Sequence, residues 1–227
     1  MIQIDNVVVD GWLAAIRGMR NPMNSWELSD SKLIDHTYIL GQNDRKLMQT
    51  LCQGGPVHAK FRRFITITMD ITAPLYWWKE FDTYKVGTVA NSCSTMHKIH
   101  AKEFTLDDFS CEHLTSEPVH VSWKDQDYTD SCVDALIDIC GVLNAAREKF
   151  LETNDKKWWW QMIQLLPSSY NQKRTVLLNY EVASHIYPDR KNHKLDEWHD
   201  FCDALKALPY SQLITGKWGE TEGAKEN

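Results

Sequence analysis

The sequence predicts a single α+β domain, because strand patterns come early in the chain and helical patterns come late rather than in alternation. One continuous core is favoured for 227 residues, since a chain of this size buries roughly 70% of its unfolded surface. The composition, 43% hydrophobic and 25% charged, is that of a globular protein. We expect the domain to cover residues 1–213 and a polar C-terminal tail to cover 214–227.

The first elements are short. A strand is predicted at residues 1–9 and a helix at 11–19, which ends at Asn21-Pro22. A second helix is predicted at 43–52, where Gly54-Gly55-Pro56 breaks it.

The clearest strand is predicted at residues 64–72, where apolar and polar side chains alternate with a period of two. The predicted buried set is Ile65, Ile67, Met69 and Ile71, and the polar set is Thr66, Thr68, Asp70 and Thr72. Ala73-Pro74 ends the strand. A short aromatic helix is predicted at 75–82, with Pro74 near its start, where a missing N–H costs little.

Helices dominate the second half. The pattern is weak from residue 85 to 123 and recovers as a long amphipathic helix at 130–151. Its predicted buried residues are Val133, Leu136, Ile137, Cys140 and Leu143. Three further helices are predicted at 155–165, 168–186 and 193–205.

Charge and cysteine usage narrow the function class. A net charge of −6 argues against a protein that coats nucleic acid or an anionic membrane, although a local pocket can still be cationic. No apolar run reaches the roughly 18 residues of a membrane span, and the N-terminus does not resemble a signal peptide. The six cysteines form no Cys-x-x-Cys, which favours reduced thiols and a cytoplasmic location.

Several short motifs are weak. His97-x-x-His100 and Cys111-x-His113 have no third ligand at a recognisable spacing, so no metal site is predicted. Trp158-Trp159-Trp160 can stack bases, but core or interface packing is favoured because no basic patch accompanies it. Neither glycine-rich nucleotide fingerprint occurs.

One segment, APLYWWKEFDTYKVGTVANSCSTMH, resembles the signature region of flavin-dependent thymidylate synthases. In that family a strand ending in proline precedes an Arg-Gln helix, an Arg-His-Arg cluster and Ser-x-Asn-Glu-x-Ser-x-Arg-Tyr. The Arg-Gln falls on Lys79-Glu80 and the Arg-His-Arg on Thr83-Tyr84-Lys85. With one inserted residue near Ala90, the last motif falls on Thr88, Asn91, Ser92, Ser94 and Met96-His97.

A second segment, LLPSSYNQKRTVLLNYEVASHIYPDR, resembles the family's Leu-Pro turn and the helix after it, which carries Asn-x-Arg and a later arginine. Without a gap, Leu166-Pro167 matches the Leu-Pro turn, Asn179 matches the asparagine and Arg190 matches the later, nucleotide-binding arginine. The two segments cover roughly the middle and C-terminal thirds of the chain.

The resemblance implies a flavin-dependent thymidylate synthase-like fold, with a small antiparallel sheet and several long helices. It implies reductive methylation of deoxyuridine monophosphate (dUMP), with methylenetetrahydrofolate as carbon donor and with FAD and NADPH as redox cofactors. It also implies a homotetramer whose sites lie between subunits, for which the tryptophans would be suitable interface anchors.

The site residues follow from the same resemblance. Lys85, Asn91 and Asn179 are expected to contact the flavin cofactor. Thr88, Ser94 and Arg190 are expected to bind the pyrimidine nucleotide, and Ser94 is the expected catalytic residue.

The departures from the family affect the chemistry. Of Arg-His-Arg only Lys85 is cationic, and three other family arginines fall on Met96, Ile163 and Glu181. Arginine binds phosphate in a bidentate way that lysine only partly replaces, so weak or lost FAD binding is expected. The alternatives are an enzyme acting on another pyrimidine nucleotide and a non-catalytic oligomeric homologue without FAD.

Overall fold

The computed structural model describes residues 2–35 and 37–218, and the chain forms two compact units. Unit 1 contains Ile71–Thr83 and Asn91–Arg174, with residues 2–3. Unit 2 contains Ile4–Asp70, Tyr84–Ala90 and the chain from Thr175 onward. The predicted single domain at 1–213 stays a prediction.

A four-stranded sheet has the strand order β1-β4-β8-β5. Its strands are β1 (Gln3–Asp10), β4 (Thr66–Pro74), β8 (Asn171–Asn179) and β5 (Val89–Ser92). A boundary between the units falls inside each of these strands, so each contributes residues to both units. Each unit also holds one antiparallel hairpin: β2 (Lys32–Ile34) with β3 (Thr37–Ile39) in unit 2, and β6 (Val119–Trp123) with β7 (Gln126–Asp130) in unit 1. The predicted α+β class is confirmed.

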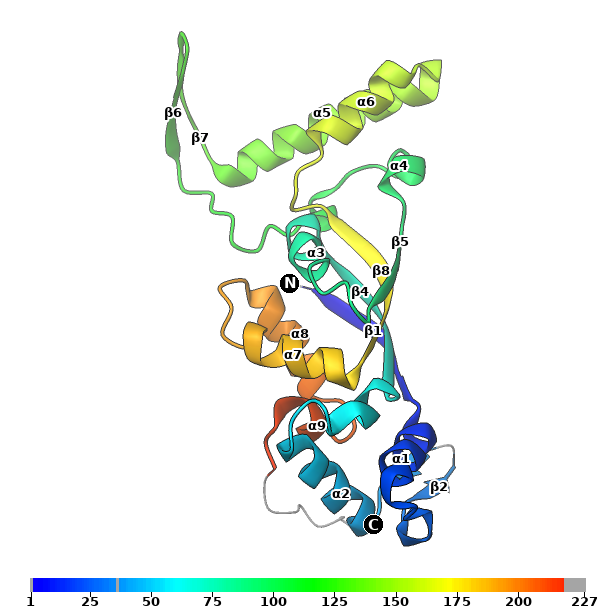
Figure 1. Ribbon diagram of the computed structural model, residues 1–227. Coiled ribbons are helices and arrows are strands. Elements are labelled where there is room, and N and C mark those ends of the chain that lie inside the picture. The colour runs from blue at the N-terminus through cyan, green and yellow to red at the C-terminus, as the bar shows by residue number, and fades with distance from the viewer. Residues whose placement is uncertain (1, 36, 219–227) are drawn as a thin grey trace. The chain divides into compact units, whose positions relative to one another are not determined.

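Unit 2 contains most of the shorter helices (Figure 1). They are α1 (Trp12–Arg20), α2 (Gln42–Gln53), α7 (Tyr180–Arg190), α8 (Asp196–Lys206) and α9 (Gln212–Thr215), with 3-10 turns at Asn21–Met23, Trp26–Leu28 and Ala59–Arg63. Trp12 packs edge-to-face on Tyr180, with ring centroids 5.5 Å apart. Trp198 and Phe201 of α8 are fully buried. Aromatic packing therefore forms much of this core.

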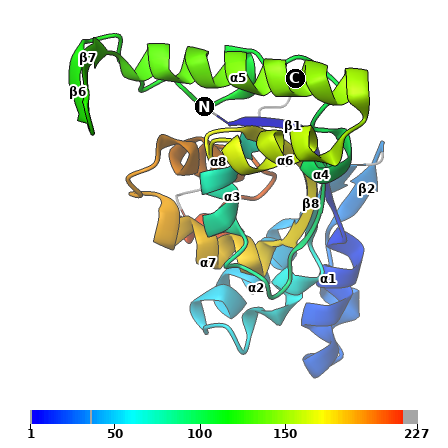
Figure 2. The same ribbon diagram turned by 90° about the horizontal axis from the view of Figure 1, so that it is seen from above.

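Unit 1 contains the long helix α5 (Cys132–Thr153) packed against α6 (Lys156–Leu165), as Figures 1 and 2 both show. Its other helices are α3 (Leu75–Phe81), α4 (Thr95–Lys98) and the 3-10 turn Leu106–Asp108. The apolar core joins Leu136, Cys140 and Leu143 of α5 to Met162 of α6. The buried face of α5 thus follows the i, i+4, i+7 spacing of a helix.

The predicted register of β4 is confirmed. Ile65, just before the strand, and Ile67, Met69 and Ile71 within it are at most 1% exposed, whereas the polar residues between them are half-buried. The strand begins at Thr66 and runs through Pro74, two residues beyond the predicted end.

The predicted helix at 168–186 is wrong in its first part. Residues 171–179 form β8, where the buried residues Gln172, Val176 and Leu178 all fall on one face of the strand. The helix α7 begins only at Tyr180, because the side chain of Asn179 caps its start by accepting a hydrogen bond from the Val182 N–H at 3.0 Å. It continues past Pro188 to Arg190, beyond the predicted end.

Other helix predictions are confirmed to within three residues at each end. Within α5, Leu136, Cys140 and Leu143 are buried as predicted, Val133 is half-buried, and the predicted burial of Ile137 is wrong because its side chain is 46% exposed. Ile137 follows Leu136 and therefore points about 100° away from the buried face. The predicted start of the tail, residue 214, lies inside α9, where Ile214 is buried. Residues 219–227 of that tail lie outside the described residues.

Candidate functional site

The segment Tyr84–Ala90 lies against the N-terminal end of α7 in unit 2. Gly87 has a φ of +84°, and a Cβ at this position would lie 2.8 Å from Val182 Cγ2 and 3.6 Å from Asn179 Nδ2. The Thr88 hydroxyl donates to the Tyr84 carbonyl at 2.5 Å and closes the turn. Only glycine allows both this backbone conformation and this close approach. The turn that carries Lys85 and Thr88 therefore approaches Asn179 through Gly87, and the roles expected of these residues stay predictions.

Arg190, at the opposite end of α7, contacts the same segment. Its Nε donates to the Tyr84 hydroxyl at 2.8 Å, and its guanidinium lies 4.5 Å from the ring centroid of Trp198 and 5.4 Å from that of Tyr84. Such contacts between a cation and aromatic rings are favourable and orient the guanidinium. Arg190 is thus a half-buried, oriented cation of unit 2 and not a solvated surface charge. Its predicted direction toward Asn91 and Ser94 stays a prediction.

Two polar groups beside this turn have no side-chain partner in the described part of the chain: the exposed Lys85 ammonium and the Asn179 Nδ2. The Asn179 Oδ1 is used as the helix cap, which leaves the amide N–H groups for a ligand. Thr88 has already donated its hydroxyl proton, so toward a ligand it can only accept.

Glu181 reverses the charge of a family arginine, but the structure neutralises it. Its buried carboxylate forms a bidentate ion pair with Arg63, in which Nη2 lies 3.1 Å from Oε1 and Nε contacts Oε2. The hydrogen bond and the charge of Glu181 raise the pKa of the Arg63 guanidinium. The expected repulsion of an anionic ligand by Glu181 is therefore reduced by a cation that the sequence alone did not reveal.

Asn91 and Ser94 belong to unit 1, on and just after β5. Two hydrogen bonds fix the segment between them to β8: Cys93 N–H donates to the Lys173 carbonyl at 2.9 Å, and Gln172 Nε2 donates to the Cys93 carbonyl at 2.9 Å. Asn91 is exposed, and its side chain has no hydrogen-bond partner among the described residues.

The Ser94 hydroxyl caps α4. Its Oγ accepts from the His97 N–H at 3.1 Å and lies 2.8 Å from His97 Nδ1. A serine paired with histidine can be a nucleophile and a base, but such pairs need a third group that orients the imidazole. Across residues 2–35 and 37–218, no acidic side chain contacts His97. The geometry therefore fits helix capping and proton exchange better than a nucleophilic serine.

Comparison with known proteins adds to this geometry. No family model and no curated protein matches the sequence. The structure resembles that of thymidylate synthase X from Helicobacter pylori, which was solved with FAD and dUMP: the TM-score is 0.65, the identity 16%, and the match covers 95% of this chain and 98% of that one. The chain has the thymidylate synthase X fold. A UMP/dUMP methylase, PolB from Streptomyces cacaoi bound to 5-Br dUMP, matches with a TM-score of 0.58 and 14% identity, over 91% of this chain and 87% of that one.

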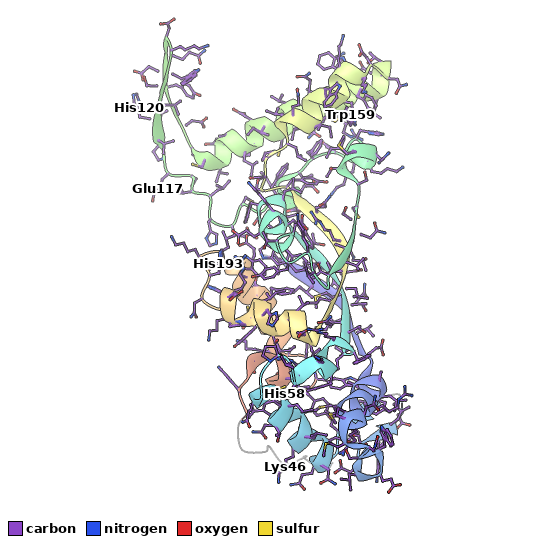
Figure 3. All side chains as sticks on the ribbon, in the orientation of Figure 1. Lys46, His58, Glu117, His120, Trp159 and His193 are labelled. Carbon is purple, nitrogen blue, oxygen red and sulfur yellow. The ribbon has the colours of Figure 1, made fainter. Side chains whose placement is uncertain are left out.

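The resemblance drawn from two short segments is thus confirmed as a thymidylate synthase X fold. One of the replaced arginine positions has become part of unit 1's packing, because Ile163 packs against the core formed by α5 and α6. The Met96 side chain is exposed, and its backbone carbonyl accepts a hydrogen bond from Trp159 Nε1 at 3.1 Å. Trp159 is labelled on α6 in Figure 3. Neither the Ile163 nor the Met96 side chain offers a positive charge to a phosphate.

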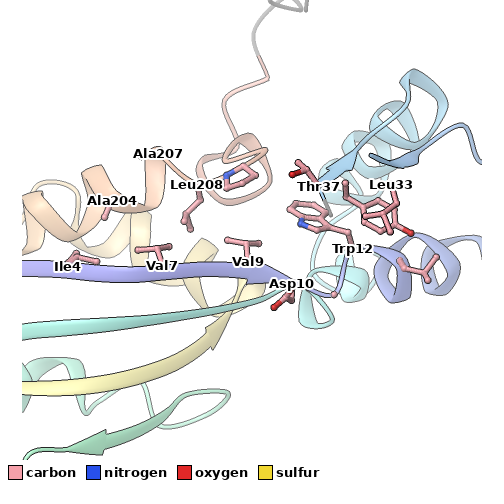
Figure 4. A pocket seen from close by; sticks show the side chains of 14 residues that line it. Ile4, Val7, Val9, Asp10, Trp12, Leu33, Thr37, Ala204, Ala207 and Leu208 are labelled. Carbon is pink, nitrogen blue, oxygen red and sulfur yellow. The ribbon is translucent and has the colours of Figure 1, made fainter. Parts of the chain in front are cut away.

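A pocket of about 840 Å³ in unit 2 lies beside β1 (Figure 4). Its walls are apolar side chains such as Ile4, Val7, Trp12 and Leu208, and among the described residues lining it only Asp10 is charged. A phosphorylated ligand would therefore find no cation there. Within the described ranges no group of three or more His, Cys, Asp or Glu residues could hold a metal ion, and no helix is long and apolar enough to cross a membrane.

Proposed function

We propose that the chain binds a pyrimidine nucleoside monophosphate and carries out the reductive methylation of dUMP, using methylenetetrahydrofolate, FAD and NADPH. The observation that carries this proposal is the Tyr84–Ala90 turn, to which α7 contributes Asn179 at one end and Arg190 at the other. The solved proteins with this fold support it, because one holds FAD and dUMP and another holds 5-Br dUMP.

In this proposal Arg190 offsets the charge of the nucleotide phosphate and Lys85 offsets part of the charge of FAD, because charge-assisted hydrogen bonds are the strongest available to a surface site. Thr88 accepts a hydrogen bond from the nucleotide, and Asn91 and Asn179 offer amide groups to the flavin. Ser94 with His97 forms the hydrogen-bonded pair through which a proton can move to or from bound nucleotide.

The residues of one chain fit FAD poorly. FAD carries a diphosphate, whereas among the family's matched cation positions only Lys79, Lys85 and Arg190 are cationic here, and Arg190 already donates to Tyr84. FAD, when bound, supplies hydride transfer. Cations from other subunits of a tetramer would have to complete its site.

We therefore expect the purified protein to contain much less than one FAD per chain. Each lost charge-assisted contact costs about 1.5–3 kcal/mol, so several lost contacts weaken binding by orders of magnitude. The flavin absorbance of the purified protein and the cofactor released on denaturation measure this directly. Stoichiometric FAD in the preparation would contradict the expectation and would strengthen the case for the full reaction.

Product formation tests the proposed reaction. Thymidylate should form from dUMP when FAD, NADPH and methylenetetrahydrofolate are supplied in excess, and its mass reports the added methyl group. UMP is the parallel substrate, because the PolB neighbour is a UMP/dUMP methylase. Methylation of UMP alone favours a different pyrimidine nucleotide as substrate. Nucleotide binding without turnover favours a non-catalytic homologue.

We also propose that the chain is a homo-oligomer, with a tetramer expected. Several apolar side chains on α5 and α6 of unit 1 are exposed in the single chain: Ile137, Val142, Leu151, Trp160 and Leu165. Burial of such side chains between subunits is favourable. Light scattering should give a mass several times that of the 26.4 kDa chain. A stable monomer would contradict the shared site.

A cytoplasmic location, with no nucleic-acid or membrane partner, remains part of the proposal.

A further inference from the structure

A second pocket of unit 2, of about 480 Å³, is lined by residues from α2, α7, α9 and the 3-10 turn Ala59–Arg63. Its polar and ionisable lining includes Arg62, His185, Lys191, Ser184, Gln53 and Gln212. None of the described residues lining it is an aspartate or glutamate. The chain as a whole has a net charge of −6. This pocket is locally positive instead, because two lysine or arginine side chains and a histidine line it and no described lining residue is acidic.

The guanidinium of Arg62 has one edge without a partner. Its Nη1 donates to the Leu213 carbonyl at 3.1 Å, while Nε is buried with no hydrogen-bond partner and Nη2 has none among the described residues. Because Nε is buried, Nη2 is the unpaired donor of this guanidinium that an anion in the pocket could reach. The unpaired Nη2 and the full charge of the guanidinium favour an anion beside Arg62.

The remaining charges in the pocket support the same ligand. Lys191 is exposed just after α7, and within the described chain neither it nor His185 forms an ion pair. The helix dipole places about half a negative elementary charge at the C-terminal end of α7, which repels an anion. This repulsion is weaker than the attraction from the full positive charge of Lys191 or Arg62. Burial raises the pKa of the Cys52 thiol, and Arg62 lowers it only partly, so the thiol adds no negative charge at neutral pH.

We infer that this pocket binds the phosphate group of a small phosphorylated molecule, at a site separate from the Tyr84–Ala90 turn. A phosphate dianion has an oxygen for each of Arg62, Lys191 and His185, whereas a carboxylate has only two oxygens. Trp218 also lines the pocket and offers a ring against which an organic group can stack. The inference rests on unit 2 alone and does not depend on the proposed methylation of dUMP.

Calorimetric titration with inorganic phosphate, with dUMP and with acetate tests the site. Phosphate should bind with a Kd of roughly 1 mM or tighter, and acetate should bind more weakly. Lys191→Gln and Arg62→Gln should each weaken phosphate binding by about tenfold to a hundredfold, the cost of one charge-assisted contact. The matched control is Lys46→Gln, an exposed cation on α2 (Figure 3), which should bind phosphate as the parent does.

Lys191→Gln keeps the test valid if Arg62→Gln fails to fold, because Lys191 is exposed and its side chain forms no hydrogen bond or ion pair among the described residues. Arg190→Ala removes the proposed turn site, so dUMP binding to this pocket is measured in that background. If Lys191→Gln and Arg62→Gln then weaken it, a phosphate ester is the ligand, and phosphate binding without dUMP binding identifies free phosphate. Absent phosphate binding, or binding unchanged in both variants, overturns the inference. Loss of phosphate binding in Arg190→Ala instead would place the anion at the turn and would also overturn a separate site.

Discussion

Replacing Arg190 with Ala is expected to weaken dUMP binding by roughly tenfold or more, because a lost charge-assisted contact to phosphate is worth about 1.4 kcal/mol or more. The structure adds a second cause. The side chain orders Tyr84 through the 2.8 Å hydrogen bond and lies over Trp198, which is fully buried. Isothermal titration of dUMP with the parent and variant measures the effect.

Two matched variants separate these causes. Tyr84→Phe removes the hydroxyl acceptor and leaves the cation, so it should reduce dUMP affinity much less than Arg190→Ala does. Arg190→Lys keeps the charge and loses the planar stacking on Trp198, and an intermediate affinity is expected. Equal losses in Tyr84→Phe and Arg190→Ala would mean that Arg190 acts by positioning Tyr84. Unchanged dUMP affinity in Arg190→Ala would mean that Arg190 does not bind the nucleotide phosphate.

Replacing Asp44 with Asn should destabilise unit 2 by about 3–5 kcal/mol, the usual cost of removing one partner of a buried ion pair. Asp44 is fully buried, and Arg20 donates to it through Nε at 2.7 Å. Ser29 and Ser31 donate their hydroxyls to its other oxygen at 2.7 and 2.6 Å. The variant leaves the buried guanidinium without a counter-charge, and chemical denaturation should show a lower midpoint.

The pH dependence of this effect has a definite sign. Burial raises the pKa of Asp44, but hydrogen bonds from Ser31 and Ser29 and the charge of Arg20 bring it below its ordinary value of 3.8. The stabilising contribution is therefore present above that value and is lost as the pH falls through the lower pKa of the folded state. The difference between parent and Asp44→Asn should be full near pH 7 and should shrink in strong acid. Glu27→Gln, at an exposed carboxylate of the same unit, is the control and should change stability little.

Local pattern was enough for much of the fold. The alternation from Ile65 to Ile71 predicts both the strand β4 and its buried face, because a strand has only two faces and one of them is apolar. The long amphipathic run predicts α5. Not every apolar residue of that run is buried, however, because the side chain of Ile137 lies outside the buried face of the helix. The ungapped spacing of Asn179 and Arg190 was also informative, since these residues prove to cap and to end one helix.

The sequence by itself therefore determined the α+β class and the register of β4. It also determined that Asn179 and Arg190 belong to the same helix. Tertiary structure alone decided that residues 171–179 form β8, since in the sheet order they lie between β4 and β5, and strand pairing overrides a local helical pattern. It also decided the charge partners. Arg190 meets Tyr84 across a separation of 106 residues, and Arg63 meets Glu181 across 118. Sequence periodicity indicates which face of a helix or strand is apolar. The residue that pairs with a charged side chain depends instead on which distant segments meet in the folded chain.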